Sequence, residues 1–277
     1  MLSMPITRTI ASRCLGVFAL IIAVSFGRGA AAFAVVDGKT VPITAAPWTV
    51  EVWEPAGKGE PRYAACTGVI IDARHILTAG HCVMAGNSAT ALQASAFRIE
   101  AGVSNFRHPL KSDHRQSRAV SAVRAMPGYT ATGNYLDSVT HDLAVLTLSR
   151  PLDLHGQDAR AAYLPRANAP GPSRESRLVI AGFGYEEPHA GVAYANGTLN
   201  EAVNPQAQES CSTGTFLCIF IRGNTCWGDS GLGAVEPGAR PIVVGILSEG
   251  VANCAPGPDG FVSLSGPAAW RFIEAAK

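Results

Sequence analysis

Short apolar runs, each of strand length, dominate this sequence. Clusters of Gly, Pro and Asn separate them, and the chain contains 29 Gly and 18 Pro among 277 residues. Regularly spaced short strands with turn residues between them are typical of all-β barrels and sandwiches, whereas βαβ folds alternate strands with helical segments. The runs lie at 48–53, 68–73, 117–126, 143–148, 176–184, 241–248 and 260–264. We therefore expect an all-β fold.

The C-terminal end departs from this pattern. Residues 267–277, PAAWRFIEAAK, place Trp270, Ile273 and Ala276 at helical spacing after a proline. This spacing predicts a terminal amphipathic helix. Within the chain, residues 167–174, ANAPGPSR, are the best linker candidate, because Pro and Gly interrupt regular elements there.

The N-terminal segment has the pattern of a targeting signal. Arg8 and Arg13 precede an apolar run at 14–26, and small residues follow it up to Ala34. A positive start, a short apolar core and a small-residue ending are typical of a secretory signal peptide. A membrane anchor is the competing interpretation, but the run is shorter than the roughly 20 residues that a spanning helix needs. We predict a signal peptide at 1–34 and a secreted, extracellular protein with no membrane attachment after its removal.

Cysteine number and charge narrow the function further. One of the 7 cysteines lies in the signal segment, and an even number remains in a chain predicted to be exported, which predicts disulfides whose pairing the count leaves open. Metal ligation competes with this interpretation, but no Cys-x-x-Cys pair and no His-Glu-x-x-His motif supports it, so we expect no metal and no cofactor. The 22 basic and 21 acidic residues argue against a nucleic-acid partner.

Three segments contain residues suited to acyl transfer. They are LTAGHC at 77–82, HDLAVLTL at 141–148 and CWGDSG at 226–231. Each has an ordinary explanation alone, such as a packed histidine or a turn aspartate. Acyl transfer by serine needs a hydroxyl, a base that takes its proton and an acid that orients the base. His81, Asp142 and Ser230 supply these groups in the order His, Asp, Ser.

With this order and these flanking residues, the chain from Val35 to the C-terminal helix resembles the trypsin/chymotrypsin family of serine proteases. The resemblance implies a chymotrypsin-like fold of two packed six-stranded antiparallel β-barrels with a C-terminal α-helix. Residues 35–160 would form the barrel that carries His81 and Asp142, and residues 161–277 the barrel that carries Ser230. It also implies a monomeric endopeptidase that hydrolyses protein or peptide substrates through an acyl-enzyme intermediate.

The resemblance implies a role for each residue of the motifs. His81 would act as the general base and then the general acid, with Asp142 orienting it and Ser230 as the nucleophile. The backbone N–H groups of Gly228 and Ser230 would form the oxyanion hole. Ser248 would pair with the substrate backbone and donate a hydrogen bond to Asp142.

Disulfide pairing and activation also follow from the resemblance. Val35, freed by cleavage after Ala34, would insert its ammonium beside Asp229, and cleavage after Arg28 is an alternative. Asp37 departs from the glycine usual near the mature start of the family. The implied disulfides are Cys66–Cys82, Cys211–Cys218 and Cys226–Cys254.

The resemblance leaves the specificity pocket less defined. Asn224 stands at the pocket floor, where a trypsin-like pocket has Asp, and Gly250 and Gly260 match the walls. Glu249 could attract a cation at the mouth or could be a solvated rim charge. We expect a bulky or polar uncharged side chain before the scissile bond.

Other functions and other histidines remain as alternatives. The main one is a catalytically silent protease-like binding protein, because fold does not imply function. An α/β-hydrolase esterase fits less well, since Gly228 to Leu232 lacks the second glycine of Gly-x-Ser-x-Gly. His75 has no evident partner in the sequence, and His141 would share the backbone position of Asp142. The remaining histidines are expected in solvated loops: His108, His114, His155 and His189.

Overall fold

The structure, a computed structural model, describes residues 35–54, 63–85, 90–129, 139–184, 197–222, 224–251 and 254–277. Internal contacts divide the chain into Met1–Ala31 and Ala32–Lys277, and every described residue belongs to the second unit. The predicted signal peptide at 1–34 and His189 therefore lie outside the described residues. Within the part that is described, no helix is long and apolar enough to cross a membrane.

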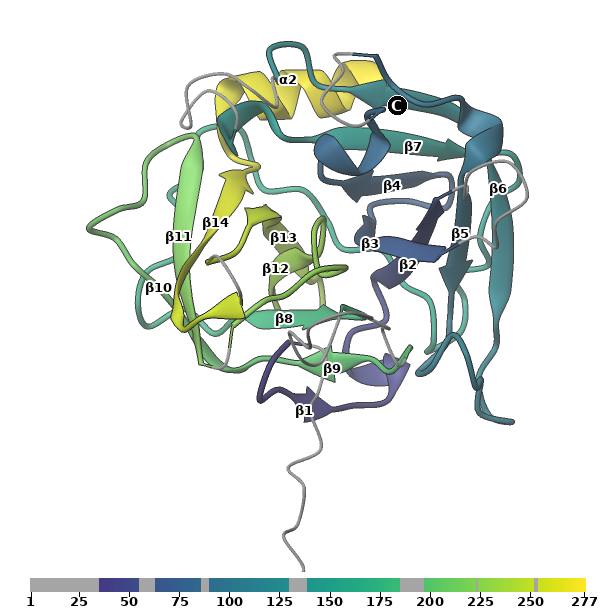
Figure 1. Ribbon diagram of the computed structural model, residues 1–277. Coiled ribbons are helices and arrows are strands. Elements are labelled where there is room, and N and C mark those ends of the chain that lie inside the picture. The colour runs from purple at the N-terminus through teal and green to yellow at the C-terminus, as the bar shows by residue number, and fades with distance from the viewer. Residues whose placement is uncertain are drawn as a thin grey trace, which may run out of the picture. The chain divides into compact units, whose positions relative to one another are not determined.

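Six antiparallel strands form a closed barrel in the first half of the chain (Figure 1). Apolar side chains that alternate along the strands, such as Val50 and Val52 on the first of them, fill its interior together with Ile76, Ile99 and Leu146. The barrel order is β2 (Thr49–Glu54), β3 (Tyr63–Ile70), β4 (His75–Thr78), β7 (Ala144–Leu148), β6 (Gln116–Ala125) and β5 (Arg98–Ala101).

The second half forms an eight-stranded antiparallel sheet that nearly closes into another barrel. Its order is β1 (Lys39–Thr40), β9 (Asn200–Glu201), β8 (Val179–Gly182), β12 (Gly233–Glu236), β13 (Ile242–Glu249), β14 (Gly257–Ser263), β11 (Phe216–Arg222) and β10 (Val203–Ala207). Ala202 alone separates β9 from β10, and its N–H donates to the carbonyl of Ile180 on β8. One bent segment therefore pairs with β8 through β9 and with β11 through β10, which brings the two ends of the sheet together.

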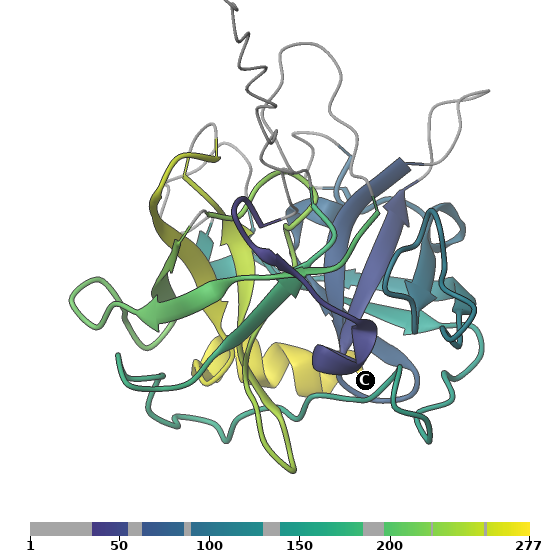
Figure 2. The same ribbon diagram turned by 90° about the horizontal axis from the view of Figure 1, so that it is seen from below.

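The short β1 belongs to this second sheet, although it lies within the range expected for the first barrel. It pairs with β9, about 160 residues later in the chain, with Thr40 opposite Asn200 (Figure 2). The expected boundary between residues 160 and 161 falls in the long connection from β7 to β8, and residues 167–174 in that connection contain neither helix nor strand.

The largest apolar cluster joins the two halves and the C-terminal helix. It contains Leu77 and Leu143 from the first barrel and Val243 from the second sheet. Helix α2 (Pro267–Ala276), predicted from the sequence, adds its buried Ala269 and Ile273 to the same cluster. The predicted fold of two barrels and a C-terminal helix is confirmed, except that the second sheet has eight strands instead of the expected six, because the short β1 and β9 extend it.

The expected disulfides are all present. Cys66–Cys82, Cys211–Cys218 and Cys226–Cys254 have Cα–Cα distances of 6.2, 5.8 and 5.0 Å. The first links β3 to the turn that contains His81. The third links the segment before Ser230 to the segment before β14.

Candidate active site

His81 and Asp142 meet because two neighbouring strands bring them to the same end of the first barrel. Strand β4 ends at Thr78 opposite Ala144, the first residue of β7, so residues just after β4 and just before β7 are close. Nδ1 of His81 lies 2.7 Å from Oδ2 of Asp142, and the backbone N–H of His81 donates to Oδ1 at 2.6 Å. Gly80 permits this approach, because a Cβ there would lie 2.9 Å from Oδ1.

The Asp142 carboxylate is buried and fully engaged, with only 2% of the residue exposed. Besides the two contacts with His81, Oδ2 accepts a hydrogen bond from the Ser248 hydroxyl at 2.7 Å. Burial, with the Asp142 charge nearby, also raises the pKa of Tyr129 to about 12. About a third of the His81 side chain, 33%, remains exposed, so the ring is held by Asp142 and still open to a ligand.

Ser230 lies on the loop between β11 and β12 and reaches the first barrel through its backbone. Its carbonyl accepts a hydrogen bond from the Thr67 N–H at 2.8 Å and lies 3.8 Å from Sγ of Cys82, the residue after His81. Ser230 also lines the same pocket as Ser248, whose hydroxyl contacts Asp142. The structure therefore brings the loop of Ser230 to the His81–Asp142 pair.

Glycines in left-handed conformations flank the Ser230 turn. Gly228 has φ +91°, and a Cβ there would lie 3.0 Å from Cα of Gly184. Gly231 has φ +85°, and a side chain there would collide with Thr78 and with the carbonyl of Thr67. L-residues other than glycine rarely adopt such φ values, so both positions require glycine. The sequence analysis did not single out Gly231, although it belongs to the same Gly-Asp-Ser-Gly motif.

Asp229 stabilises the Ser230 loop within the second half. It is fully buried, and its carboxylate accepts hydrogen bonds from the N–H groups of Gly184 and Cys226 at 3.0 Å and of Val35 at 3.3 Å. Burial raises the pKa of Asp229 to about 7, with the three N–H groups opposing the shift and Asp259 adding to it. The expected neighbours Val35 and Asp229 are therefore in contact.

Two further glycines make room for this carboxylate. A Cβ at Gly182 or Gly184 would collide with the Asp229 side chain. The sequence analysis missed both, although the run Ala181 to Gly184, AGFG, at the end of β8 suggests a close approach of another group to the backbone.

A pocket beside Ser230 contains most of the expected substrate-binding residues. Its lining residues are Thr225, Cys226, Trp227, Ser230, Leu247, Ser248, Glu249, Gly250, Val251 and Cys254. Asn224 is buried behind them, and its Nδ2 donates to the carbonyl of Ala255.

Gly260 does not face this pocket. A Cβ on Gly260 would lie 2.7 Å from Cζ of Phe216, so this residue faces the other side of β14. The preceding residue, Asp259, is directed toward the pocket wall instead. Its Oδ2 accepts hydrogen bonds from the N–H and hydroxyl of Thr225 at 3.1 and 2.8 Å, and its Oδ1 accepts one from the Val251 N–H at 3.3 Å.

Comparison with known proteins identifies the family. The sequence profile described as Trypsin matches residues 35–270. The chain belongs to the trypsin family. Trypsin alpha of Drosophila melanogaster is 25% identical over 233 residues, covering 80% of this chain and 78% of that protein. The proclotting enzyme of Tachypleus tridentatus is 27% identical over 115 residues, which cover 42% of this chain and only 29% of that enzyme.

A solved structure has the same fold as this trypsin-family chain. The human heparin binding protein matches with a TM-score of 0.65 over 87% of this chain and 95% of that one, at 21% identity. At this identity the likeness concerns the fold alone.

Two other histidines of this trypsin-family chain also contact carboxylates. The expectation that His75 has no partner is wrong, because its Nδ1 lies 2.8 Å from Oδ2 of Asp72, three residues earlier. His114, expected in a solvated loop, is 85% exposed but also places Nδ1 2.5 Å from Oδ2 of Asp158. His108 and His155 are exposed, as expected.

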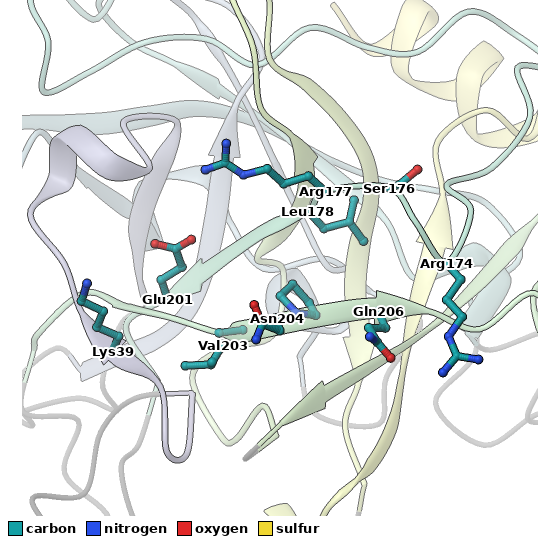
Figure 3. Close-up of a pocket in the computed structure, with 11 residues that line it drawn as sticks. Lys39, Arg174, Ser176, Arg177, Leu178, Glu201, Val203, Asn204 and Gln206 are labelled. Atoms are coloured by element: carbon teal, nitrogen blue, oxygen red, sulfur yellow. The ribbon is translucent and has the colours of Figure 1, made fainter.

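The structure also contains a possible metal cluster and a second hollow. Cys66, His81 and Cys82 are close enough to hold an ion, but the two cysteines form a disulfide, so their sulfurs are not free thiolates. The second hollow lies where β9 bends into β10 and is lined by Lys39, Arg174, Arg177 and Glu201, among other residues (Figure 3). None of the three triad residues lines it, so it is not part of the candidate active site.

Proposed function

We propose that the protein is a secreted serine endopeptidase that hydrolyses peptide bonds through an acyl-enzyme intermediate. The observation that carries this proposal is the buried Asp142 carboxylate, which holds the His81 ring and the Ser248 hydroxyl beside the loop of Ser230. Membership of the trypsin family supports the reaction class.

The chemistry follows from the orientation of the His81 ring. With Nδ1–H donating to Asp142, Nε2 is the acceptor nitrogen of the ring and would take the proton of the Ser230 hydroxyl. Ser230 Oγ then attacks the carbonyl carbon, and the N–H groups of Gly228 and Ser230 stabilise the negative oxygen. His81 passes its proton to the amine, which departs. The acyl group stays bonded to Ser230 Oγ and forms the acyl-enzyme. His81 then takes a proton from water as the water attacks the acyl carbon, and it returns this proton to Ser230 Oγ when the bond to the released acid breaks.

The Val35–Asp229 contact supports activation by cleavage before Val35. A buried carboxylate without a cationic partner is costly. The backbone nitrogen of Val35 lies 3.3 Å from Oδ2 of Asp229, so a free ammonium at this position would neutralise that charge. Removal of the signal peptide after Ala34 during export would then also activate the enzyme. The product would act as a monomer on proteins or peptides, with no nucleic-acid or membrane partner.

The activities of variants at Ser230, His81 and His114 test this proposal. Ser230→Ala and His81→Ala should each lower kcat on a peptide substrate by about 10⁴-fold or more, because the triad acts as a unit. His114→Ala removes another histidine–carboxylate pair and should leave kcat unchanged. Equal activity in the wild type and Ser230→Ala would overturn the proposal.

The second candidate is a catalytically silent binding protein on the same fold. The fold shared with a human heparin binding protein is the observation that favours it. A folded chain starting at Val35 that hydrolyses no peptide and whose Ser230 resists acylating reagents would establish this candidate instead.

A further inference from the structure

Strand β2 places a buried glutamate on the outer side of the first barrel, against the Ser230 loop. Val50 and Val52 belong to the barrel interior, so Glu51 between them faces outward, because successive residues of a strand point to opposite sides. Glu51 is nevertheless only 1% exposed. Its electrostatic neighbours include Asp229, the residue before Ser230. A carboxyl of the first barrel is therefore buried close to the loop of the second half.

Thr67, directly opposite Glu51 on β3, holds this loop by two hydrogen bonds. Its N–H donates to the carbonyl of Ser230 at 2.8 Å, and its hydroxyl donates to the carbonyl of Gly228 at 2.9 Å. These carbonyls belong to the two residues whose N–H groups are proposed to form the oxyanion hole. Directly opposite residues of paired strands have Cβ atoms about 4.5–5.5 Å apart, on the same face. Glu51 therefore lies beside the threonine that fixes Gly228.

The Glu51 carboxyl lacks a hydrogen-bond partner for one of its oxygens. Its Oε2 is buried and accepts no hydrogen bond within the described part of the chain. Burial, with the Asp229 charge nearby, raises the pKa of Glu51 well above its usual value, because an unpaired buried carboxylate is costly. Arg107 opposes this shift, and Glu100 on β5, which is itself paired with Arg115 at 2.8 Å, adds to it. Glu51 is therefore a buried acid that keeps its proton to an unusually high pH.

Ionisation of this acid would compete for the proton that fixes the loop. The Thr67 hydroxyl has a single proton to donate, and in the structure this proton goes to the Gly228 carbonyl. A carboxylate is a stronger acceptor than a neutral carbonyl. Once Glu51 ionises, its carboxylate can draw the hydroxyl away from Gly228 and leave the oxyanion-hole segment less firmly held.

We propose that Glu51 is a positioning residue for the Ser230 loop: in its neutral form it leaves Thr67 bound to Gly228, and its ionisation releases that contact and slows the chemical step. This inference rests on the proposed protease function. It gives the first barrel a part in holding the nucleophile loop, through two residues that the sequence analysis assigned to no site.

The alkaline side of the pH profile tests the role of Glu51. In the chain that starts at Val35, kcat on a peptide substrate should fall as the pH rises, with rates normalised to the fraction of Ser230 that an organophosphorus reagent labels. Glu51→Gln, whose amide cannot ionise, should move the midpoint of this fall upward by at least about one pH unit, with little change in KM. The Val35 ammonium also titrates in this range, but it is common to both proteins. Glu201→Gln, in the separate hollow lined by Lys39, is the matched control and should leave the midpoint in place.

Two variants of Thr67 test the route from Glu51 to the loop. Thr67→Val removes the hydroxyl and should lower kcat by about 10-fold, because the Gly228 carbonyl loses its donor. Thr67→Ser keeps the hydroxyl and should retain most of the wild-type kcat. In the Thr67→Val background, Glu51→Gln should move the alkaline midpoint much less than it does in the wild type, since the two changes act through one contact.

The outcomes separate this inference from the protease proposal. Fully labelled wild type and Glu51→Gln with the same alkaline midpoint would overturn the inference and leave the protease proposal intact. Equal kcat in Thr67→Val and Thr67→Ser, or a midpoint shift of the same size with and without the Thr67 hydroxyl, would also overturn it. Failure of Ser230 to label at all would overturn the protease proposal instead.

Discussion

The two halves of the molecule hold the proposed catalytic groups in different ways. In the first barrel, the pairing of β4 with β7 brings His81 and Asp142 together. The Asp142 carboxylate accepts a hydrogen bond from the backbone N–H of His81 and also contacts Nδ1 of its ring. In the second half, Ser230 lies on a loop that depends on Asp229, a buried carboxylate held by backbone N–H groups. The proposed base, His81, is thus positioned by strand pairing, and the proposed nucleophile, Ser230, by a loop built around the buried Asp229.

This difference indicates where regulation can act. The contacts between His81 and Asp142 join two residues of the first half of the chain. The Asp229 carboxylate would be charge-neutralised by a nearby cation, and in the proposed activation this cation is the ammonium at Val35, whose backbone nitrogen lies 3.3 Å from Oδ2. We therefore expect changes in the first half to alter the chemical step and changes around Asp229 to alter the order and stability of the loop.

The largest effect should come from Asp142→Asn. An amide cannot hold the His81 ring in the same tautomer, so kcat should fall by about 10⁴-fold while the urea midpoint of unfolding changes little. Steady-state kinetics and urea unfolding of the same preparation measure the two quantities. A large loss of stability with little loss of kcat would instead show that Asp142 acts mainly in folding.

The second effect concerns the new N-terminus and pH. In a chain that starts at Gly29, Asp229 keeps its proton up to about pH 7 when folded but releases it near pH 3.8 when unfolded. The stability that this proton contributes is therefore lost as the pH rises from 3.8 to 7, on the order of 4 kcal/mol. A chain that starts at Val35 gains an ammonium partner that lowers the pKa of Asp229, so it should lose less.

Chemical unfolding of the two chains at pH 5 and pH 8, in the Ser230→Ala background, measures this difference. The stability advantage of the Val35 start should be larger at pH 8 than at pH 5. An advantage that is equal at both pH values would show that Asp229 is not the group involved.

A smaller effect should follow from Gly231→Ala. The left-handed backbone and the collision with Thr78 should cost about 1–3 kcal/mol of stability and displace Ser230, lowering kcat by about 10²-fold. Gly238→Ala is the matched control, because a Cβ there meets nothing within 4 Å. Equal stability and kcat for both variants would contradict the strained geometry of the nucleophile turn.

The smallest effect should come from Ser248→Ala. This change removes one hydrogen bond to Asp142, worth about 1.5–3 kcal/mol for a charged acceptor, while both His81 contacts remain. We expect kcat to fall by about 10-fold, far less than for Asp142→Asn. A loss as large as that of Asp142→Asn would show that the first barrel does not position Asp142 by itself.

Much of the site could be predicted from local sequence, because the motifs around His81, Asp142 and Ser230 lie in short contiguous segments. The terminal helix was equally readable from its spacing of apolar residues. Strands β4 and β5 have four residues each, which is too short for a periodic pattern, and Pro205 interrupts the pattern of β10. Apolar patterning therefore did not identify these strands.

At the pocket wall, a shift in strand register decides which side chains of β14 face the pocket wall and which face away from it. The pairing of β13 with β14 shifts between Leu247 and Glu249, and successive residues of a strand face opposite sides. That placement directs Asp259 to Thr225 in the pocket wall and Gly260 to Phe216. A bulge of this kind depends on pairing between segments and cannot be read from either segment alone.

The most direct test of the account is covalent labelling of the chain that starts at Val35 with an organophosphorus reagent, followed by mass spectrometry of its peptides. We predict one label per chain, on the peptide that contains Ser230, and loss of that label in His81→Ala but not in His114→Ala. A folded chain that takes no label, or takes it on another serine at the same rate with and without His81, would contradict the proposed triad.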